Sequence, residues 1–287
     1  MIISRRTQEA SGVHSALQAS IDNAIAMTPA VRWSISIRDK RGEELASHDS
    51  DAVLSTASIG KVLLLAEVAH QYEAGSLLGT ELLHRTADIA VGDAGLWQHL
   101  QVETLSVEDI ATLVASTSDN LATNVLLKRV GLSQVQELGR SLGLTKTTLL
   151  DRVRDQRSPE DPPGLSTGSA GELSDLMHRI SNGSAISPFV SKQLEKWLSR
   201  GGDLSMVPSS FGFDPLAHVT EDRGFLVRNK TGNDTGVRAD VGFLSGSKAI
   251  LSYAAIANWK DSHQDSRDLV MTAMQNIGKS LRVCVEQ

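Results

Sequence analysis

The first regular feature of the chain is an apolar residue at every fourth position near its beginning: Val13, Leu17, Ile21 and Ile25. This spacing places the four side chains on one face of an α-helix. Pro29 follows soon afterwards and lacks the backbone N–H that a helix interior requires, so we expect the helix to end before it.

Strand patterns occupy both ends of the chain. Residues 31–37 alternate apolar and polar side chains, and the turn sequence DKRGEE leads into a second short strand around Leu45. Near the other end, three further strands are predicted over residues 224–232, 237–246 and 248–259. The last of these is apolar enough to be buried on both faces.

The middle of the chain, from residue 58 to about residue 200, has the apolar period of helices. Ser106 is a helix-capping residue with Asp109 three positions later, and the buried stripe that follows is Ile110, Leu113 and Val114. Another helix is predicted over LATNVLLKRVG. The sequence DRVRDQRSPEDPPGLSTG, residues 151–168, interrupts the helices, and irregular segments of this length are usually functional or disordered.

A last helix is predicted near the end of the chain, with charges placed to match the helix dipole. Its apolar positions are Leu269, Ala273, Ile277 and Leu281, and its charges are Asp265, Asp268, Lys279 and Arg282. Because helix and strands occur at both ends with helices between them, we expect two domains. Residues 1–57 and 205–287 would form an α/β domain, and residues 58–204 an all-helical domain. No internal repeat is visible.

Composition and charge exclude several classes of protein. The 287 residues are 40% hydrophobic and 22% charged, as in a globular protein with a substantial core. The net charge of -6 comes from charges of both signs along the whole chain, which argues against nucleic acid or an anionic membrane as a partner. No apolar run approaches the ~20 residues of a membrane span. We expect a monomer that binds a small molecule.

The N-terminal sequence MIISRRTQEASGVHS contains an arginine pair, but polar residues follow it in place of the apolar stretch of an export signal. The sequence as it stands predicts a cytoplasmic protein, whereas a removed leader would make it periplasmic or secreted. Cys284 is the only cysteine, so no internal disulfide can form. The eight histidines show no metal-binding spacing, and we expect neither a metal nor a cofactor.

Ser58 and Lys61 lie three residues apart in STASIGKVLLLAEV. Such a pair occurs roughly once by chance in a chain of this length, and a second copy runs from Ser245 to Lys248. The helical stripe after Ser58 puts the two side chains on one face, about 5–6 Å apart at Cβ, where the amine can accept the hydroxyl proton. A strand follows Ser245, so we interpret the second copy as a turn.

Two more short motifs follow in order: S-D-N at residues 118–120 and K-T-G at residues 230–232. Each has a chance frequency of roughly 0.05 in a chain of this size. The series S-x-x-K, S-D-N and K-T-G is the signature of class A β-lactamases and penicillin-binding proteins. The chain resembles a class A serine β-lactamase from its first helix to its last. Asn124 and the sequence LDR at residues 150–152 are similar to that class as well.

This resemblance implies the α/β (α+β) fold of that family, an antiparallel sheet flanked by helices plus a helical domain, with the active site in the cleft between them. It also implies four roles. Ser58 attacks the carbonyl carbon, Lys61 accepts its proton, Ser118 passes the proton to the leaving nitrogen, and Lys230 supplies positive charge. Burial or a neighbouring cation would lower the lysine pKa far enough for this chemistry.

The resemblance also assigns the substrate contacts. Asn120 would bind the side-chain amide of the substrate, and the backbone N–H groups of Ser58 and Asn233 would form the oxyanion hole. The substrate carboxylate would meet Thr231 and an arginine, which is Arg238 if the preceding turn is one residue short. The predicted substrate-binding residues are Asn120, Thr231, Gly232, Asn233 and Arg238.

The sequence departs from the family after LDR, where class A enzymes carry a glutamate and, four residues later, an asparagine that hold the deacylating water. Arg154 and Ser158 occupy these positions. Loss of a positioned general base slows a reaction about 10²- to 10⁴-fold, so we expect acylation with slow deacylation. Asp155, Glu160 or Asp161 could replace the glutamate if the loop folds differently.

Three functions remain open. They are a β-lactamase with another deacylation base, a D-alanyl peptidase, esterase or amidase on the same site, and a binding protein that stays acylated. The sequence GLSTG at residues 164–168 also matches the nucleophile motif of α/β-hydrolases. That motif needs a hydrophobic strand before it, and SPEDPP stands there instead, so we set it aside.

Overall fold

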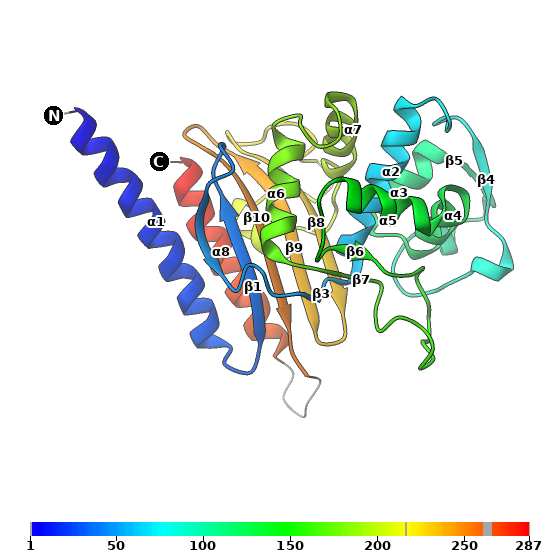
Figure 1. Ribbon diagram of the computed structural model, residues 1–287, viewed down its shortest axis with the longest axis horizontal. Helices are drawn as coiled ribbons and strands as arrows, with labels where there is room; N and C mark the ends of the chain where they lie inside the picture. Colours follow the sequence, from blue (N-terminus) through cyan, green and yellow to red (C-terminus); the bar gives the residue numbers. More distant parts are fainter. Residues whose placement is uncertain (1, 216, 261–265, 287) are drawn as a thin grey trace.

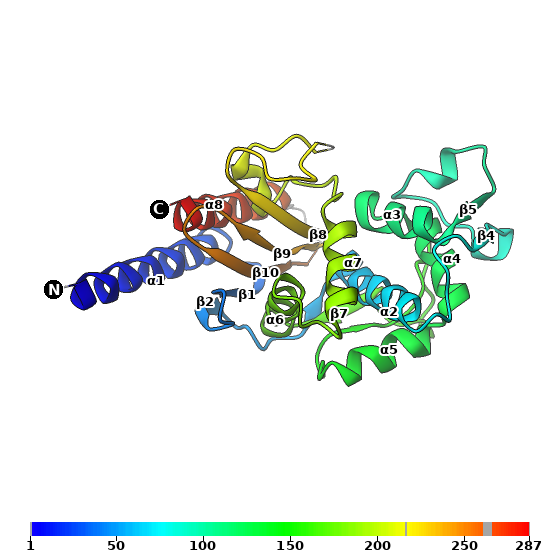
Figure 2. The same cartoon turned by 90° about the horizontal axis from the view of Figure 1, so that it is seen from above.

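The structure is a computed structural model of the protein. It describes residues 2–215, 217–260 and 266–286, with side chains described from residue 12 onward except that of Val13. Figures 1 and 2 show a sheet with helices on both faces and a cluster of helices beside it.

The strands predicted at the two ends of the chain join in one sheet. They are β1 (Arg32–Arg38), β2 (Glu44–His48), β8 (Leu226–Asp234), β9 (Val237–Ser245) and β10 (Ile250–Asn258). Their order is β2-β1-β10-β9-β8, and every neighbouring pair is antiparallel. The expected antiparallel sheet is therefore confirmed. The turn predicted after Ser245 connects β9 to β10.

Helices α1 (Ile2–Met27) and α8 (Arg267–Glu286) cover one face of this sheet, and α6 (Ala170–Ser181) covers the other (Figures 1 and 2). Alternate residues of β10 enter two different cores. Tyr253 packs in the core of α1 and α8, whereas Ile256 packs in the core that extends into the helical cluster. The predicted burial of both faces of this strand is confirmed.

The terminal helices follow the sequence pattern with one exception. Leu17 and Ile21 are fully buried, and α1 ends before Pro29 as predicted. Leu269 is 47% exposed, so its assignment to the buried stripe is wrong. The stripe begins one residue later, about 100° around the helix. Its members are Val270, Ala273, Met274, Ile277 and Leu281. Asp265 lies outside the described residues.

The helical cluster consists of α2 (Lys61–Glu73), α3 (Val107–Thr117), α4 (Asn120–Val130), α5 (Leu132–Ser141) and α7 (Pro188–Leu198). The predicted cap of α3 is confirmed, because Asp109 N donates to Ser106 Oγ at 3.1 Å and the Ser106 hydroxyl donates to the Asp109 carboxylate at 2.6 Å. Ile110 and Val114 are fully buried, while Leu113 is half-buried.

The segment 58–204 is not all-helical, contrary to the sequence expectation. It contains β4 (Leu82–His84), β5 (Thr104–Ser106), β6 (Thr148–Leu149) and β7 (Ser166–Gly168), and β7 pairs with both β6 and β3 (Leu54–Ser55). These strands are too short for an alternating pattern to be recognised. The segment also contributes α6, which packs on the large sheet.

Four 3-10 turns complete the described elements: η1 (Ala57–Gly60), η2 (Ala87–Ile89), η3 (Trp97–His99) and η4 (Val207–Phe211). Residues 150–165 contain neither helix nor strand, which confirms the irregular segment up to the start of β7. Among the described residues, no helix is both long enough and apolar enough to cross a membrane.

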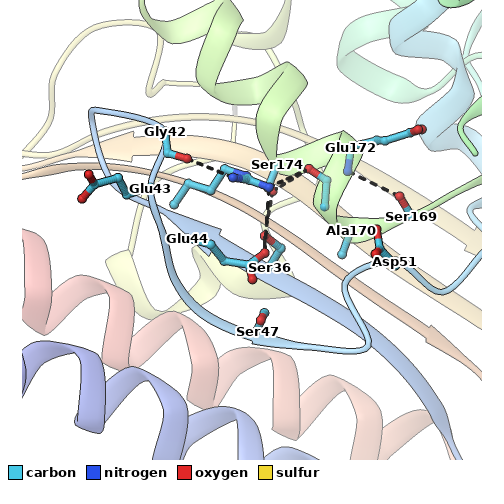
Figure 3. Close-up of polar contacts among 12 residues, drawn as sticks. Ser36, Gly42, Glu43, Glu44, Ser47, Asp51, Ser169, Ala170, Glu172 and Ser174 are labelled. Carbon is cyan, nitrogen blue, oxygen red and sulfur yellow. Dashed lines mark hydrogen bonds and ion pairs between the residues drawn. The ribbon is translucent and has the colours of Figure 1, made fainter. Parts of the chain in front are cut away.

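Polar contacts fix α6 to β1, the second strand of the sheet (Figure 3). Ser174 Oγ lies 2.8 Å from Ser36 Oγ, and the Ser36 hydroxyl donates to Glu44 at 2.8 Å. The Arg38 guanidinium donates to Ser174 Oγ and to the Gly42 carbonyl, both at 2.9 Å. These contacts hold the start of α6 in place, and β7, which precedes it, therefore has a fixed position.

Candidate active site

Ser58 lies on a tight turn immediately before α2. This turn is the 3-10 helix η1, in which Ala57 has a left-handed φ of 47°. A 3-10 helix has three residues per turn, so residues i and i+3 lie one above the other. Lys61, the first residue of α2, therefore follows Ser58 on the same side of the turn.

The buried hydroxyl of Ser166, on β7, holds this turn. It donates to the Ala57 carbonyl at 2.6 Å, accepts from Gly60 N at 3.2 Å, and lies 2.7 Å from Thr56 Oγ1. A Cβ at Gly60 would lie 2.4 Å from Ser166 Cβ, so only glycine permits this approach. The serine of GLSTG is therefore a support for the Ser58 turn, consistent with the rejection of that motif.

Ser118 and Asn120 reach the site from the junction of α3 and α4. Ser118 ends α3 with a left-handed φ of 55°, and Asp119 caps α4 by accepting from Ala122 N at 2.8 Å. The other oxygen of Asp119 accepts from the backbone N–H groups of residues 96 and 97, at 2.7 and 2.8 Å. The S-D-N motif therefore presents its first and third side chains to the site and uses the second to fix the backbone.

Two buried lysines meet at the Ser118 hydroxyl. Lys61 Nζ donates to the Ser118 carbonyl at 2.6 Å, to Asn120 Oδ1 at 2.8 Å and to Ser118 Oγ at 3.2 Å. Lys230, on β8, donates to Ser118 Oγ at 2.9 Å and to the Thr231 carbonyl at 2.8 Å. The structure thus brings three of the predicted catalytic side chains into one hydrogen-bonded group.

Burial changes the protonation of both lysines. Burial and the positive charge of Lys230 lower the pKa of Lys61 well below its usual value, although nearby carboxylates such as Asp93 oppose the shift. Burial also lowers the pKa of Lys230 to about 8, against the attraction of Asp203 and Asp240. A lysine with a lowered pKa is present partly as the neutral amine, which is the form that accepts a proton.

Within the described residues, the Ser58 hydroxyl has no hydrogen-bond partner. The Lys61 amine has three neighbouring oxygens, two on Ser118 and one on Asn120. Because its pKa is lowered, the neutral amine can supply the lone pair that proton transfer from Ser58 requires.

One cavity of about 750 Å³ contains the predicted residues Ser58, Ser118, Asn120, Lys230, Thr231 and Asn233. Strand β8 runs directly against the Ser58 turn, because a Cβ added to Gly232 would lie 2.2 Å from the Thr56 carbonyl and 3.2 Å from Ser58 N. Gly232 is therefore needed for the close approach of two backbones. The two segments predicted to supply the oxyanion hole are in contact.

Arg238 is placed differently from the other predicted residues. It pairs with Asn233 in the register of β8 and β9. Its guanidinium donates to the carbonyls of Asp234 and Val237, at 2.9 and 2.7 Å. It is not one of the described residues that line the cavity, and its contact with a substrate carboxylate stays a prediction.

The loop after LDR contributes Arg154 and Asp155 to the cavity wall. Arg154 is held by Asp151 at 2.6 Å and by Asp161 at 3.1 Å. Asp155 Oδ1 accepts from Gly92 N at 2.9 Å. Arg154, to which the resemblance assigns the position of the deacylating glutamate, is therefore a paired arginine, and the next residue is a carboxylate.

Val153 and Arg157 of this loop also line the cavity, whereas Ser158, Glu160 and Asp161 do not. Ser158 donates from its backbone N and its hydroxyl to Asp161, at 2.8 and 3.0 Å, and Glu160 is exposed. Asn124 fixes the loop backbone, since it accepts from Val153 N at 2.9 Å and donates to Val153 O at 3.0 Å. Of the three carboxylates considered from the sequence, Asp155 is the one in the described cavity wall.

Besides Asp234 at the exposed end of β8, two further carboxylates in the cavity wall were not predicted. Asp93 lies in the loop between η2 and η3, and Asp203 lies between α7 and η4. Asp203 accepts a hydrogen bond from Asn233, 30 positions away, which no local pattern reveals. The only sequence signal is that both carboxylates stand beside glycines, a composition typical of tight turns.

A profile of the "Beta-lactamase enzyme family" matches residues 16–283 of the chain. The chain belongs to this β-lactamase family. The resemblance inferred from the three motifs is therefore confirmed.

Individual members of the β-lactamase family are distant from this chain. It is 24% identical over 186 residues to β-lactamase CARB-3 of Pseudomonas aeruginosa, covering 61% of each sequence. It is 26% identical over 246 residues to β-lactamase L2 of Stenotrophomonas maltophilia, covering 83% of this chain and 77% of that one. The match to CARB-3 thus spans 61% of the length of that relative.

Solved structures confirm the fold. A β-lactamase from Sphaerobacter thermophilus has a TM-score of 0.80 at 24% identity, over 93% of this chain and 95% of that chain. PBP-A has a TM-score of 0.77 at 21% identity, over 92% of this chain and 94% of that chain. The fold expected from the resemblance is therefore that of β-lactamases and of PBP-A.

Proposed function

We propose that this member of the β-lactamase family is a serine hydrolase that opens β-lactam amides through a Ser58 acyl-enzyme and deacylates it slowly. The observation that supports the proposal most strongly is the hydrogen-bonded group of Lys61, Ser118 and Lys230 in the cavity of Ser58. All these residues belong to one chain, and we propose a monomer that acts on a small molecule.

In the proposed acylation step, neutral Lys61 Nζ accepts the hydroxyl proton of Ser58, and Ser58 Oγ bonds to the β-lactam carbonyl carbon. The carbonyl oxygen takes the electron pair and is stabilised by the N–H groups of Ser58 and Asn233. The C–N bond then breaks as the Ser118 hydroxyl gives its proton to the leaving nitrogen. Ser118 regains a proton from Lys61, with which it already shares a hydrogen bond.

Substrate positioning follows from the same cavity. Asn120 is fixed by two contacts, since Oδ1 accepts from Lys61 at 2.8 Å and Nδ2 donates to the Gly92 carbonyl at 3.3 Å. It can therefore present its amide to the amide side chain of a substrate in a fixed orientation. Thr231 and Asn233 form the opposite wall on β8.

The slow second step is proposed from the loop. A deacylating water needs a carboxylate base aimed at it, and the resemblance implies that Arg154 stands where the family has one. Asp155 lies in the wall but is exposed and bound to Gly92 N. If the deacylation rate were zero, the protein would be a binding protein that stays acylated. A mutant of PBP-A, with a TM-score of 0.75 at 21% identity, was solved as an acyl-enzyme complex with penicillin G.

The proposal is tested by intact-protein mass spectrometry after mixing with penicillin G, followed over time, with peptide mapping of the adduct. We expect one adduct per chain, on Ser58, that persists. Ser58→Ala should abolish it and keep the fold. Ser245→Ala, in the second S-x-x-K copy, is the matched control and should label normally. A label on Ser166, or none on any residue, would contradict the proposal.

A further inference from the structure

Asp203 holds a carboxylate at the β8 end of the cavity. Its Oδ1 accepts from the Ser205 hydroxyl at 2.6 Å and from Ser205 N at 3.1 Å, and its Oδ2 accepts from Asn233 Nδ2 at 3.2 Å. The Asp203 carbonyl accepts from Asn229 Nδ2 at 3.2 Å, so the backbone is attached to β8 as well. The position of this carboxylate is therefore fixed.

This carboxylate is ionised at neutral pH. Burial acts to raise the pKa of Asp203, but hydrogen bonds from Ser205, Thr231 and Asn233 outweigh it and hold the pKa below its usual value. The negative charge also reaches Lys230, whose pKa it raises against the effect of burial. Asp203 is thus a permanent anion beside the K-T-G strand.

The residues expected to bind a substrate carboxylate are differently placed. The Thr231 side chain acts to lower the pKa of Asp203 and lines the same cavity. The Arg238 guanidinium donates to backbone carbonyls and does not line the described cavity. A carboxylate of the protein therefore lines the cavity together with Thr231, to which the resemblance assigns the carboxylate of the substrate.

The other charged side chains of the cavity wall do not neutralise the negative charge of Asp203. The carboxylates in the wall are Asp93, Asp155, Asp203 and Asp234. The two arginines, Arg154 and Arg157, are each bound to Asp151, at 2.6 and 2.7 Å. An anionic group that enters this end of the cavity would meet Asp203, and Lys230 is the one lysine among the described residues of the wall.

Asp203 also lines a second hollow of about 300 Å³. Gly202 and Asp203 line both spaces. Beyond them, the second hollow is lined mainly by Leu204, Pro208, Phe213 and Pro215, together with two serines. A carboxylate that lines both the cavity and a mainly apolar hollow fits a substituent with a cationic head or an uncharged apolar body.

We propose that Asp203 makes this site select acyl donors with a neutral or cationic group beside the scissile bond and disfavour those with a carboxylate there. This selectivity rests on the proposed acylation of Ser58. Asp203 acts as a specificity-determining residue and takes no part in proton transfer.

The test compares three forms of one acyl donor: penicillin G, its methyl ester and its aminoethyl amide. The second-order rate of Ser58 acylation is measured for each by intact-protein mass spectrometry. Because the charge is only partly buried, we expect the ester and the amide to react at least about tenfold faster than the acid. If Ser58 of the wild-type protein is acylated faster by the acid than by the ester and the amide, the inference is overturned, and no variant is needed.

The substitution Asp203→Asn removes the negative charge of the side chain and keeps its shape. In this variant the acid should react at least about tenfold faster than in wild type, while the rate for the ester changes less than about threefold. Asp234→Asn is the matched control: Asp234 also lines the cavity but is exposed, so the ratio of acid to ester should stay close to that of wild type.

The outcomes are distinguishable. Equal loss of all three rates in Asp203→Asn would show a structural role and overturn the inference, while labelling of Ser58 in wild type would still support the proposed function. An unchanged ratio of acid to ester would overturn it as well. If none of the three compounds labels Ser58 in wild type, the proposed function fails and the inference fails with it.

Discussion

The two walls of the Ser58 cavity are built differently. On one wall, Lys61 and Lys230 are buried and converge on the Ser118 hydroxyl at 3.2 and 2.9 Å. On the other wall, charged side chains of the loop after Leu150 form ion pairs with one another, such as that of Arg154 with Asp151 at 2.6 Å. Asp155 on that wall is exposed.

This difference shows which ionisable residues can exchange a proton during the reaction. Burial without a carboxylate partner in direct contact lowers the lysine pKa values and produces a base on the first wall. On the second wall, ion pairing holds the pKa of Asp151 below and that of Arg154 above their usual values, so both stay charged. Such groups hold a loop in place and do not exchange protons at neutral pH.

The largest expected effect is on the first wall. Lys61→Ala removes the proposed base, so we expect acylation to slow about 10²- to 10⁴-fold. Lys248→Ala is the matched control, because Lys248 is the lysine of the second S-x-x-K copy and is exposed in the turn before β10. Stopped-flow acylation with a chromogenic cephalosporin gives the rates, and a thermal melt confirms folding. A rate within threefold of wild type would remove Lys61 from its proposed role.

The next effect concerns the pH dependence of acylation. The rate should rise with pH as Lys61 loses its proton, and fall above about 8 as Lys230 loses its charge. Since the charge of Lys230 lowers the pKa of Lys61, Lys230→Met should move the rising limb to higher pH and remove the falling limb. The two limbs belong to the coupled pair, so both must be followed in each protein.

A pH–rate profile of acylation between pH 5 and pH 10 measures this shift. Lys192→Met, an exposed lysine on α7, is the control and should leave the profile unchanged. A rising limb that moves to lower pH in Lys230→Met would mean that the two lysines do not interact as the structure indicates.

The first wall could be predicted from the sequence because each of its motifs is local. Ser58 and Lys61 share one turn, Ser118 and Asn120 flank one helix cap, and the K-T-G residues lie on one strand. Their order along the chain then identified the family. The large sheet and most helices were predicted for the same reason, since their periods extend over many residues.

The features that could not be predicted from the sequence depend on contacts between segments that lie far apart along the chain. Asp203 reaches β8 across 30 positions, and Asp93 belongs to a loop without a motif. Arg238 was assigned by counting residues, but the side chain is bound to carbonyls at the hairpin. The strands of two or three residues, β3 to β7, exist only because neighbouring chain segments supply their partners.

The smallest effect is expected on the second wall, with Asp155→Asn. After a burst of one product per chain, the slow phase with a chromogenic cephalosporin measures deacylation. An exposed carboxylate bound to Gly92 N is poorly placed to activate a water at the ester, so the slow phase should change less than about threefold. Glu160→Gln, exposed on the same loop and outside the described cavity wall, is the control. A slow phase reduced tenfold in Asp155→Asn, with the burst intact, would make Asp155 the deacylation base and would mean that both walls are built for proton transfer.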